Sequence, residues 1–326
     1  MSKAKPKIAF YWCAACGGCE ESIVDLAEDI LKVVAAVDIV FWPVALDFKR
    51  SDVEAMPDGS ITASFINGAV RLTEQEEMVK LLRRKSQIVV AHGACSHLGG
   101  IPGLGNFWNK ETIFRRAYLT TPSTDNPKGT VPQEKSIVDG KELHLPGFFD
   151  TVQTLDQVID VDYYLPGCAP PRDLILTAVE ALLEGKLPPK GSVLSPNKSE
   201  CEECDRNDSK PEKLEIKEIK RPWEIFLDPK LCFLAQGIIC LGPATRTGCG
   251  QRCITANMPC RGCFGPTDQV LDQGAKFLSA FASILATNEE KEIDKIVQSI
   301  VDPAGTFYRF SLPHSILRRK RLEAVK

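Results

Sequence analysis

Hydrophobic and polar positions along residues 1–190 follow the order expected of successive strands and helices. Apolar runs of strand length occupy residues 7–12, 37–42, 87–92 and 161–165. Stretches whose apolar positions recur at helical spacing occupy residues 20–36, 74–84 and 170–185. The last stretch begins with two prolines and ends at Gly185, as helices often do. This order predicts an α/β fold with an open, mainly parallel, doubly wound sheet.

The remaining segments depart from that pattern. Residues 118–145 hold prolines, glycines and scattered charges, which predicts a surface insertion. Residues 198–221 hold seven basic and eight acidic side chains, so we expect a solvated linker over most of that stretch. Residues 231–266 are dense in Cys and Gly with little strand or helix pattern, and residues 268–301 predict two amphipathic helices. We therefore expect two domains, 1–195 and 196–326, the second one irregular and helical.

Composition narrows the function classes. The 326 residues include 40 basic and 43 acidic side chains, and a net charge of −3 gives no general attraction to nucleic acid or anionic lipid. No apolar run reaches the ~18 residues of a membrane span. The segment 3–16 only weakly imitates a signal peptide, because its apolar part is short and runs into cysteines. We expect a cytoplasmic protein, with the basic residues 318–321 forming a solvated end.

Thirteen cysteines in a chain of this length indicate metal-binding thiols. Cys13, Cys16 and Cys19 follow the first predicted strand, Cys95 follows the strand 87–92, and Cys168 follows the strand 161–165. Turns after parallel strands meet at one sheet edge, where ligands bind. Glycines accompany each of these turns and let the backbone approach a cofactor closely. Four of these five thiols, with either Cys13 and Cys16 or Cys16 and Cys19 from the first turn, could bind one [4Fe–4S] cluster or one structural zinc.

The second half of the chain carries eight more cysteines, enough for two further sets of four. Their positions are Cys201, Cys204, Cys232, Cys240, Cys249, Cys253, Cys260 and Cys263. Paired C-x2-C spacings are typical of metal sites and occur in zinc ribbons as well. Apolar residues surround these thiols, which favours redox clusters shielded from solvent. Twelve thiols then give three four-Cys clusters with one Cys left over, an arrangement suited to electron transfer.

At these residues the sequence resembles the electron-transferring small subunit of [NiFe] hydrogenases. The resemblance covers nearly the whole chain, and its type is the cytoplasmic, F420-non-reducing (methyl-viologen-reducing) one that works with heterodisulfide reductase. Five motifs in order carry it: residues 12–22 (WCAACGGCEES), 93–101 (GACSHLGGI), 166–171 (PGCAPP), 240–243 (CLGP) and 259–266 (PCRGCFGP). The family motif aligns with Cys16 and Cys19 as cluster ligands, because Glu21 and Ser22 then match its next two positions. Cys13 would then be a buried residue next to the cluster.

The resemblance implies which thiols share a cluster. The proximal [4Fe–4S] cluster would be held by Cys16, Cys19, Cys95 and Cys168. The medial cluster would be held by Cys249, Cys253, Cys260 and Cys263. The distal cluster would be held by Cys201, Cys204, Cys232 and Cys240. Two departures matter: Cys201 stands where many members have His, and Cys253 supplies a fourth medial thiol where many members have three and a [3Fe–4S] cluster. We therefore expect three all-thiolate [4Fe–4S] clusters.

The resemblance also implies partners and roles. H2 would be split at a NiFe centre on a separate large subunit, and electrons would pass to an iron–sulfur or flavin acceptor such as a [2Fe–2S] delta subunit and heterodisulfide reductase, in an anaerobic, methanogenic setting. Glu21 would pass protons at the large-subunit interface; a plain first-turn Glu, like Glu20, is the alternative. His92 and His97 are either donors to cluster sulfur or ordinary core residues.

Two other functions remain open on the sequence alone. The related small subunit of complex I usually has adjacent cysteines in its cluster motif, and this chain has none. A zinc-binding assembly scaffold would use the same C-x2-C pairs. The sheet is expected to be flavodoxin-like, but the chain lacks a G-x-G-x-x-G phosphate loop for a flavin, and thiols occupy the edge that a flavin would use.

Overall fold

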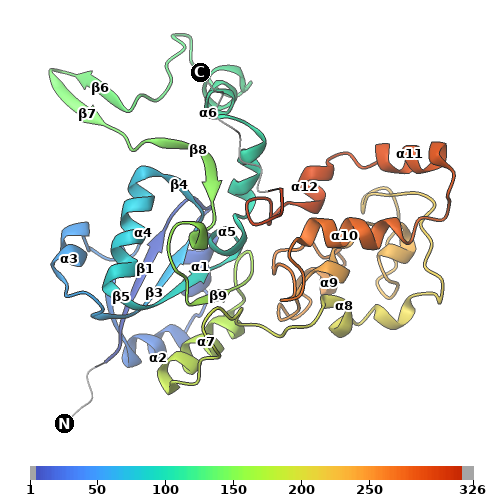
Figure 1. Cartoon of the computed structure of the whole chain (residues 1–326), viewed down its shortest axis with the longest axis horizontal. Helices are drawn as coiled ribbons and strands as arrows, with labels where there is room; N and C mark the ends of the chain where they lie inside the picture. Colours follow the sequence, from blue (N-terminus) through green and yellow to red (C-terminus); the bar gives the residue numbers. More distant parts are fainter. Residues whose placement is uncertain (1–4, 318–326) are drawn as a thin grey trace.

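The computed structural model describes residues 5–317 and forms two lobes (Figure 1). The first lobe is built on a five-stranded parallel sheet in the order β2-β1-β3-β5-β9. Its strands are β1 (Lys7–Trp12), β2 (Asp38–Phe41), β3 (Ile61–Asn67), β5 (Ser86–His92) and β9 (Tyr163–Leu165). This is the strand order of flavodoxin-like folds, so the predicted fold class is confirmed.

Helices cover both faces of this sheet (Figure 1). They are α1 (Gly18–Val24), α2 (Asp29–Ala36), α3 (Arg50–Ala55), α4 (Thr73–Lys85), α5 (Ala94–Leu98) and α7 (Arg172–Glu184), while α6 (Lys110–Phe114) lies beside β8 above the sheet. Successive side chains of β1 point to opposite faces of the sheet and so belong to two separate hydrophobic cores. Ala9 and Tyr11 pack with α3 and α4, while Ile8 and Phe10 pack with α1 and α7. A sheet buried on both faces explains why apolar residues predominate in its strands.

The structure of this lobe departs from the sequence analysis in two places: one strand was missed, and one predicted helix is divided. The central strand β3 was not predicted, because Thr62, Ser64 and Asn67 interrupt its apolar pattern. Ser64 is nonetheless fully buried and shares a 2.6 Å hydrogen bond with Ser86. The predicted single helix 20–36 is wrong, since α1 and α2 are separated by a turn in which Ala27 takes a left-handed φ of 53°.

The segment 118–145 is exposed, as expected of a surface insertion. It contains an antiparallel hairpin of β6 (Lys135–Val138) and β7 (Lys141–His144). Outside it, β4 (Val70–Leu72) pairs antiparallel with β8 (Phe148–Gln153) beside the main sheet. Both pieces lie at the upper side of the first lobe in Figure 1.

The second lobe is made of loops and short helices around its own apolar core. Its helices are α8 (Glu200–Glu203), α9 (Arg252–Thr255), α10 (Gln273–Ala282), α11 (Glu290–Gln298) and α12 (Pro303–Phe307). The two amphipathic helices expected over 268–301 correspond to α10 and α11. The expectation of a solvated linker over 198–221 is wrong for Glu200, Arg206 and Ile216, which are buried at 1%, 4% and 1% exposure. The boundary between 195 and 196 stays a prediction.

The end of the described chain returns from α12 to the first lobe. The Gly100 N–H donates to the Phe310 carbonyl at 2.9 Å, and Gln157 donates to the Pro313 carbonyl at 2.9 Å. Pro313 packs so closely on Gly99 that a Cβ there would lie 2.2 Å from its ring. This segment therefore packs against the loop that follows Cys95. The basic residues 318–321 lie outside the described residues.

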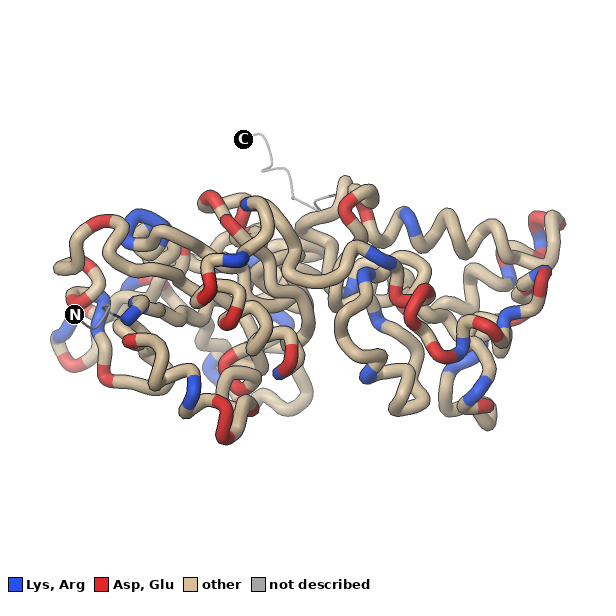
Figure 2. The backbone as a smooth tube through the Cα atoms, turned by 90° about the horizontal axis from the view of Figure 1, so that it is seen from below, with Lys and Arg blue, Asp and Glu red and all other residues tan. Residues whose placement is uncertain are grey.

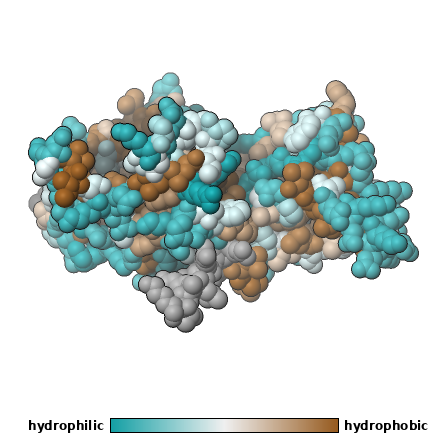
Figure 3. Space-filling model, turned by 90° about the horizontal axis from the view of Figure 1, so that it is seen from above, coloured by the Kyte–Doolittle hydropathy of each residue, from teal (hydrophilic) through white to brown (hydrophobic). Residues whose placement is uncertain are grey.

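The surface matches the near-neutral composition. Basic and acidic residues are interspersed over both lobes (Figure 2). The space-filling view is mainly hydrophilic, with apolar patches on each lobe (Figure 3). Within residues 5–317, no helix combines the length and apolar character needed to cross a lipid bilayer.

Candidate metal centres

The first set of thiols lies where three strands of the sheet end. Cys16 and Cys19 follow β1, Cys95 lies in α5 after β5, and Cys168 follows β9. Burial raises the pKa of Cys19, and the nearby thiols of the other three raise it further. The structure thus brings these four predicted thiols together at the carboxyl edge of the sheet.

Two glycines let the backbone pass close to these sulfur atoms. A Cβ on Gly93 would lie 2.4 Å from Cys19 Sγ, and a Cβ on Gly100 would lie 2.4 Å from Cys95 Sγ. Both glycines have positive φ, +88° and +56°, which residues other than Gly rarely adopt. Sequence reasoning identified the glycines, and the structure gives the reason for each.

Burial works against free thiolates here. It raises the pKa of Cys95 to about 12, and the neighbouring Cys168 and Cys16 thiols add to the shift. Four thiolates in such a place need a compensating positive charge, which bound iron or another soft metal supplies. The donor set and its close-fitting backbone therefore fit a metal centre.

Cys13 belongs to a different environment. It is 5% exposed and lies in the core between the sheet and α4. Burial raises its pKa, with the Glu74 carboxylate as its charged neighbour. The structure thus places the leftover thiol within the hydrophobic core.

The two acids after Cys19 differ in a way the sequence did not reveal. Glu21, the predicted proton carrier, is exposed in the first turn of α1. Glu20 is 6% exposed, accepts a 2.5 Å hydrogen bond from Asn67 Nδ2 and accepts another from Trp42 Nε1. Burial raises the pKa of Glu20 despite these bonds. The partners of Glu20 lie 22 and 47 positions away, so no local pattern could have identified it.

His92 and His97 are both buried in the first lobe. The His92 Nε2 lies 3.4 Å from Ser22 Oγ, and burial lowers the His92 pKa to about 4. The His97 ring centroid lies 4.6 Å from that of Tyr164, and burial lowers the His97 pKa to about 3. Both are therefore neutral at physiological pH, and these contacts describe them as packed core side chains.

The predicted medial thiols line a single cavity in the second lobe. Its lining includes Cys249, Cys253, Cys260, Cys263 and the buried Glu200. The Cys249 thiol donates to Glu200 Oε1 at 3.5 Å. Burial raises the pKa of Cys249 to about 11, with the Glu200 charge adding to the effect. The structure thus brings Cys253 to the three thiols that match the family motif.

The predicted distal thiols line a neighbouring cavity. Its lining includes Cys201, Cys204, Cys232 and Cys240, with Lys210. Burial raises the pKa of Cys201 to about 11, although Lys210 opposes the shift. A Cβ on Gly242 would lie 3.1 Å from Cys201 Sγ, another close approach of backbone to sulfur. In residues 5–317, no three His, Cys, Asp or Glu side chains converge closely enough to hold a single metal ion.

Backbone contacts join the three sets in sequence. The Cys168 backbone lowers the pKa of the Cys263 thiol and the Cys168 thiol raises it, so the first set neighbours the second. The Cys260 backbone likewise lowers the pKa of Cys240, and the Leu241 N–H donates to the Cys260 carbonyl at 3.0 Å, so the third set neighbours the second. The twelve thiols therefore form a continuous row of three groups that crosses from one lobe to the other.

Comparisons with known proteins agree with this arrangement. The family model "NADH ubiquinone oxidoreductase, 20 Kd subunit" matches residues 16–182. The iron-sulfur subunit of the F420-non-reducing hydrogenase of Archaeoglobus profundus is 42% identical over 317 residues, covering 96% of this chain and 98% of the relative. The corresponding F420-non-reducing hydrogenase subunit of Methanothermobacter thermautotrophicus is 38% identical over 319 residues, covering 97% of each.

Among solved structures, the [NiFeSe] hydrogenase of Desulfovibrio vulgaris Hildenborough is similar in fold. The TM-score is 0.52 at 18% identity, covering 81% of this chain and 95% of that chain. The family match and the near full-length relatives together show that the chain belongs to the NADH ubiquinone oxidoreductase 20 Kd subunit family and, within it, to the [NiFe] hydrogenase small subunits of the F420-non-reducing type.

Proposed function

We propose that this chain relays electrons in a hydrogenase whose H2-splitting NiFe centre lies on a separate large subunit. The observation that carries the proposal is the row of three four-thiol groups, in which each group neighbours the next. When bound, three [4Fe–4S] clusters would supply one-electron redox chemistry between H2 oxidation and an acceptor.

Each set has a defined position in this proposal. Cys16, Cys19, Cys95 and Cys168 hold the proximal cluster. Cys249, Cys253, Cys260 and Cys263 hold the medial cluster. Cys201, Cys204, Cys232 and Cys240 hold the distal cluster. The role of the protein is to space the sites, exclude water from them and set their charge environment.

The exposed thiols of the first set indicate the side on which the large subunit binds. Cys16 and Cys168 are exposed in this chain, while Cys19 and Cys95 are buried. Glu21 is exposed close to Cys19 in sequence, and we assign it the transfer of protons at that interface. The exposed Trp12, 38% accessible at the end of β1, offers apolar contact area there.

The distal thiols are the last set in the row, so we expect the electron acceptor to bind on their side of the chain. We propose a [2Fe–2S] delta subunit and a heterodisulfide reductase as electron acceptors in the cytoplasm of an anaerobe with methanogenic metabolism. A zinc scaffold is the competing function, and thiol sets of this kind would also bind zinc.

Metal analysis of the anaerobically purified chain with its co-purifying subunits tests the proposal. We expect about twelve irons and matching sulfide per chain, as three four-iron clusters require. Stoichiometric zinc without iron would contradict it. The chain separated from its large subunit should take up no H2, and uptake by the chain alone would refute the division of labour.

A further inference from the structure

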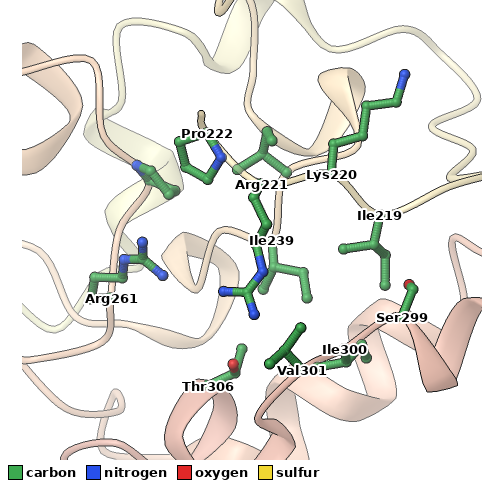
Figure 4. Close-up of a pocket in the computed structure, with 12 residues that line it drawn as sticks. Ile219, Lys220, Arg221, Pro222, Ile239, Arg261, Ser299, Ile300, Val301 and Thr306 are labelled. Atoms are coloured by element: carbon green, nitrogen blue, oxygen red, sulfur yellow. The ribbon is translucent and has the colours of Figure 1, made fainter. Parts of the chain in front are cut away.

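A basic pocket lies on the second lobe (Figure 4), and two of its lining residues, Ile239 and Arg261, are sequence neighbours of the thiols Cys240 and Cys260. Arg221 and Arg261 project into it, together with the Thr306 hydroxyl (Figure 4). The walls are apolar side chains and prolines: Ile219, Pro222, Ile238, Ile239, Pro259, Ile300 and Val301. Among the residues that the structure describes, no acidic side chain lines the pocket.

The positive charges of the pocket have no carboxylate partner within residues 5–317. Neither Arg221 nor Arg261 forms an ion pair within 4.0 Å there. Arg221 and Arg261 reach the same pocket, and no acidic side chain of its described lining offsets their charge. Lys220 points away from the pocket and pairs with Glu218 at 3.3 Å. Like charges held together beside apolar walls are stabilised by an anion.

The pocket is separated from two thiol sets by a single layer of chain. Ile239 on its wall directly precedes Cys240 of the distal set, and Arg261 directly follows Cys260 of the medial set. These two segments of chain are joined by a 3.0 Å hydrogen bond from Leu241 N–H to the Cys260 carbonyl. A redox group bound at this pocket would therefore lie beside both sets.

The loop that follows Arg221 exposes two large aromatic side chains. Trp223 is 75% exposed, and the Arg221 guanidinium lies 5.4 Å from its ring centroid. Phe226, three residues further along the same loop, is 97% exposed. Exposed aromatic residues next to arginines are typical of protein–protein contact surfaces.

We propose that this pocket receives an acidic segment of the protein that accepts electrons from the chain. The carboxylates of the segment pair with Arg221 and Arg261, and its apolar part packs on Trp223 and Phe226. The inference rests on the proposed electron relay and names the surface and the charge of the partner that the relay uses.

The test uses the holoenzyme with its large subunit and, as probe, a plant-type [2Fe–2S] ferredoxin, an acidic one-electron carrier. H2-driven reduction of the ferredoxin is measured per unit of reduction of methyl viologen, a small cationic dye. Arg221→Glu should lower this ratio about tenfold at low ionic strength and weaken its salt dependence. Arg116→Glu, an equal charge change on the exposed surface of the first lobe, should leave the ratio unchanged.

A second measurement needs no variant. Arginine modification by phenylglyoxal should be slower at Arg221 when the ferredoxin is present. An unchanged ratio in Arg221→Glu, equal modification of Arg221 with and without ferredoxin, or a wild-type enzyme that reduces the dye but not the ferredoxin would each overturn the inference. Iron is also measured in the same samples. A content near twelve irons per chain means that a negative result contradicts the docking site and not the proposed relay.

Discussion

Gly93→Ala tests whether the sheet edge is shaped around a metal-bound sulfur. The new Cβ would lie 2.4 Å from Cys19 Sγ, whereas ordinary contact begins at 3.4 Å, so the sulfur must move by about 1 Å. Metal–sulfur bonds tolerate shifts of only about 0.2 Å. A φ of +88° adds roughly 1–3 kcal/mol of backbone strain. We expect the variant to lose the first cluster, about four of twelve irons.

Gly191→Ala is the matched control for this prediction. Gly191 also has a φ of +88°, but no atom of the described residues lies within 4 Å of the position of its Cβ. It should show a similar loss of stability in urea unfolding and keep its full iron content. Iron, sulfide and EPR analysis of both variants, purified anaerobically, distinguishes strain from displacement of the sulfur. Full iron content in Gly93→Ala would refute the argument.

Three further predictions concern a ligand, a charge and the pH dependence of stability. Cys253→Ala should convert the medial site to a [3Fe–4S] EPR signal, while Cys13→Ala should keep the wild-type spectrum; an unchanged Cys253→Ala spectrum would remove Cys253 from the site. Arg261→Gln removes a positive charge that acts on Cys253 and Cys240, so potentiometric titration should show lower midpoint potentials for the medial and distal clusters and an unchanged proximal one. Medial and distal midpoint potentials equal to those of the wild-type protein would contradict this prediction. Asp162 is 9% exposed as a side chain and, although burial opposes it, hydrogen bonds from Lys190 and Arg83 hold its pKa below the usual range. The stabilisation that the ionised Asp162 carboxylate gives to the fold is complete above pH ~4 and is lost as the pH falls through this lowered pKa. Asp162→Asn should therefore reduce stability by roughly 2 kcal/mol at pH 7 and flatten the acid limb of the unfolding curve, with Asp160→Asn as an exposed control.

The sheet could be predicted wherever burial on both faces leaves an uninterrupted apolar run, as in β1 and β5. It could not be predicted at β3, where Ser64 and Asn67 are buried and form hydrogen bonds with partners distant in sequence. The break between α1 and α2 was equally invisible, because Ala27 favours helices yet takes a left-handed conformation there. Local patterns give the burial of apolar side chains but not the pairing of buried polar ones.

The thiol groups were more predictable than the rest of the site. Topology brings turns after parallel strands together, so the order of strands along the sequence was enough to place Cys95 and Cys168 near Cys19. The second lobe has no parallel sheet to which this rule applies, so the grouping of Cys201 with Cys240 rested on the family resemblance. The acidic and basic segment 198–221 was misjudged because Arg206 is buried by folding over Phe233, 4.2 Å from its ring centroid. No pattern in the sequence indicated that the segment around Pro313 packs against the first lobe.

An anaerobic crystal of the holoenzyme, measured at the iron absorption edge, tests the central claim most directly. The account predicts three separate iron sites in this chain, each touched by its own four cysteines, in a row from the sheet edge to the far side of the second lobe. Iron at fewer sites, zinc in their place, or cysteines bonded to one another would contradict it.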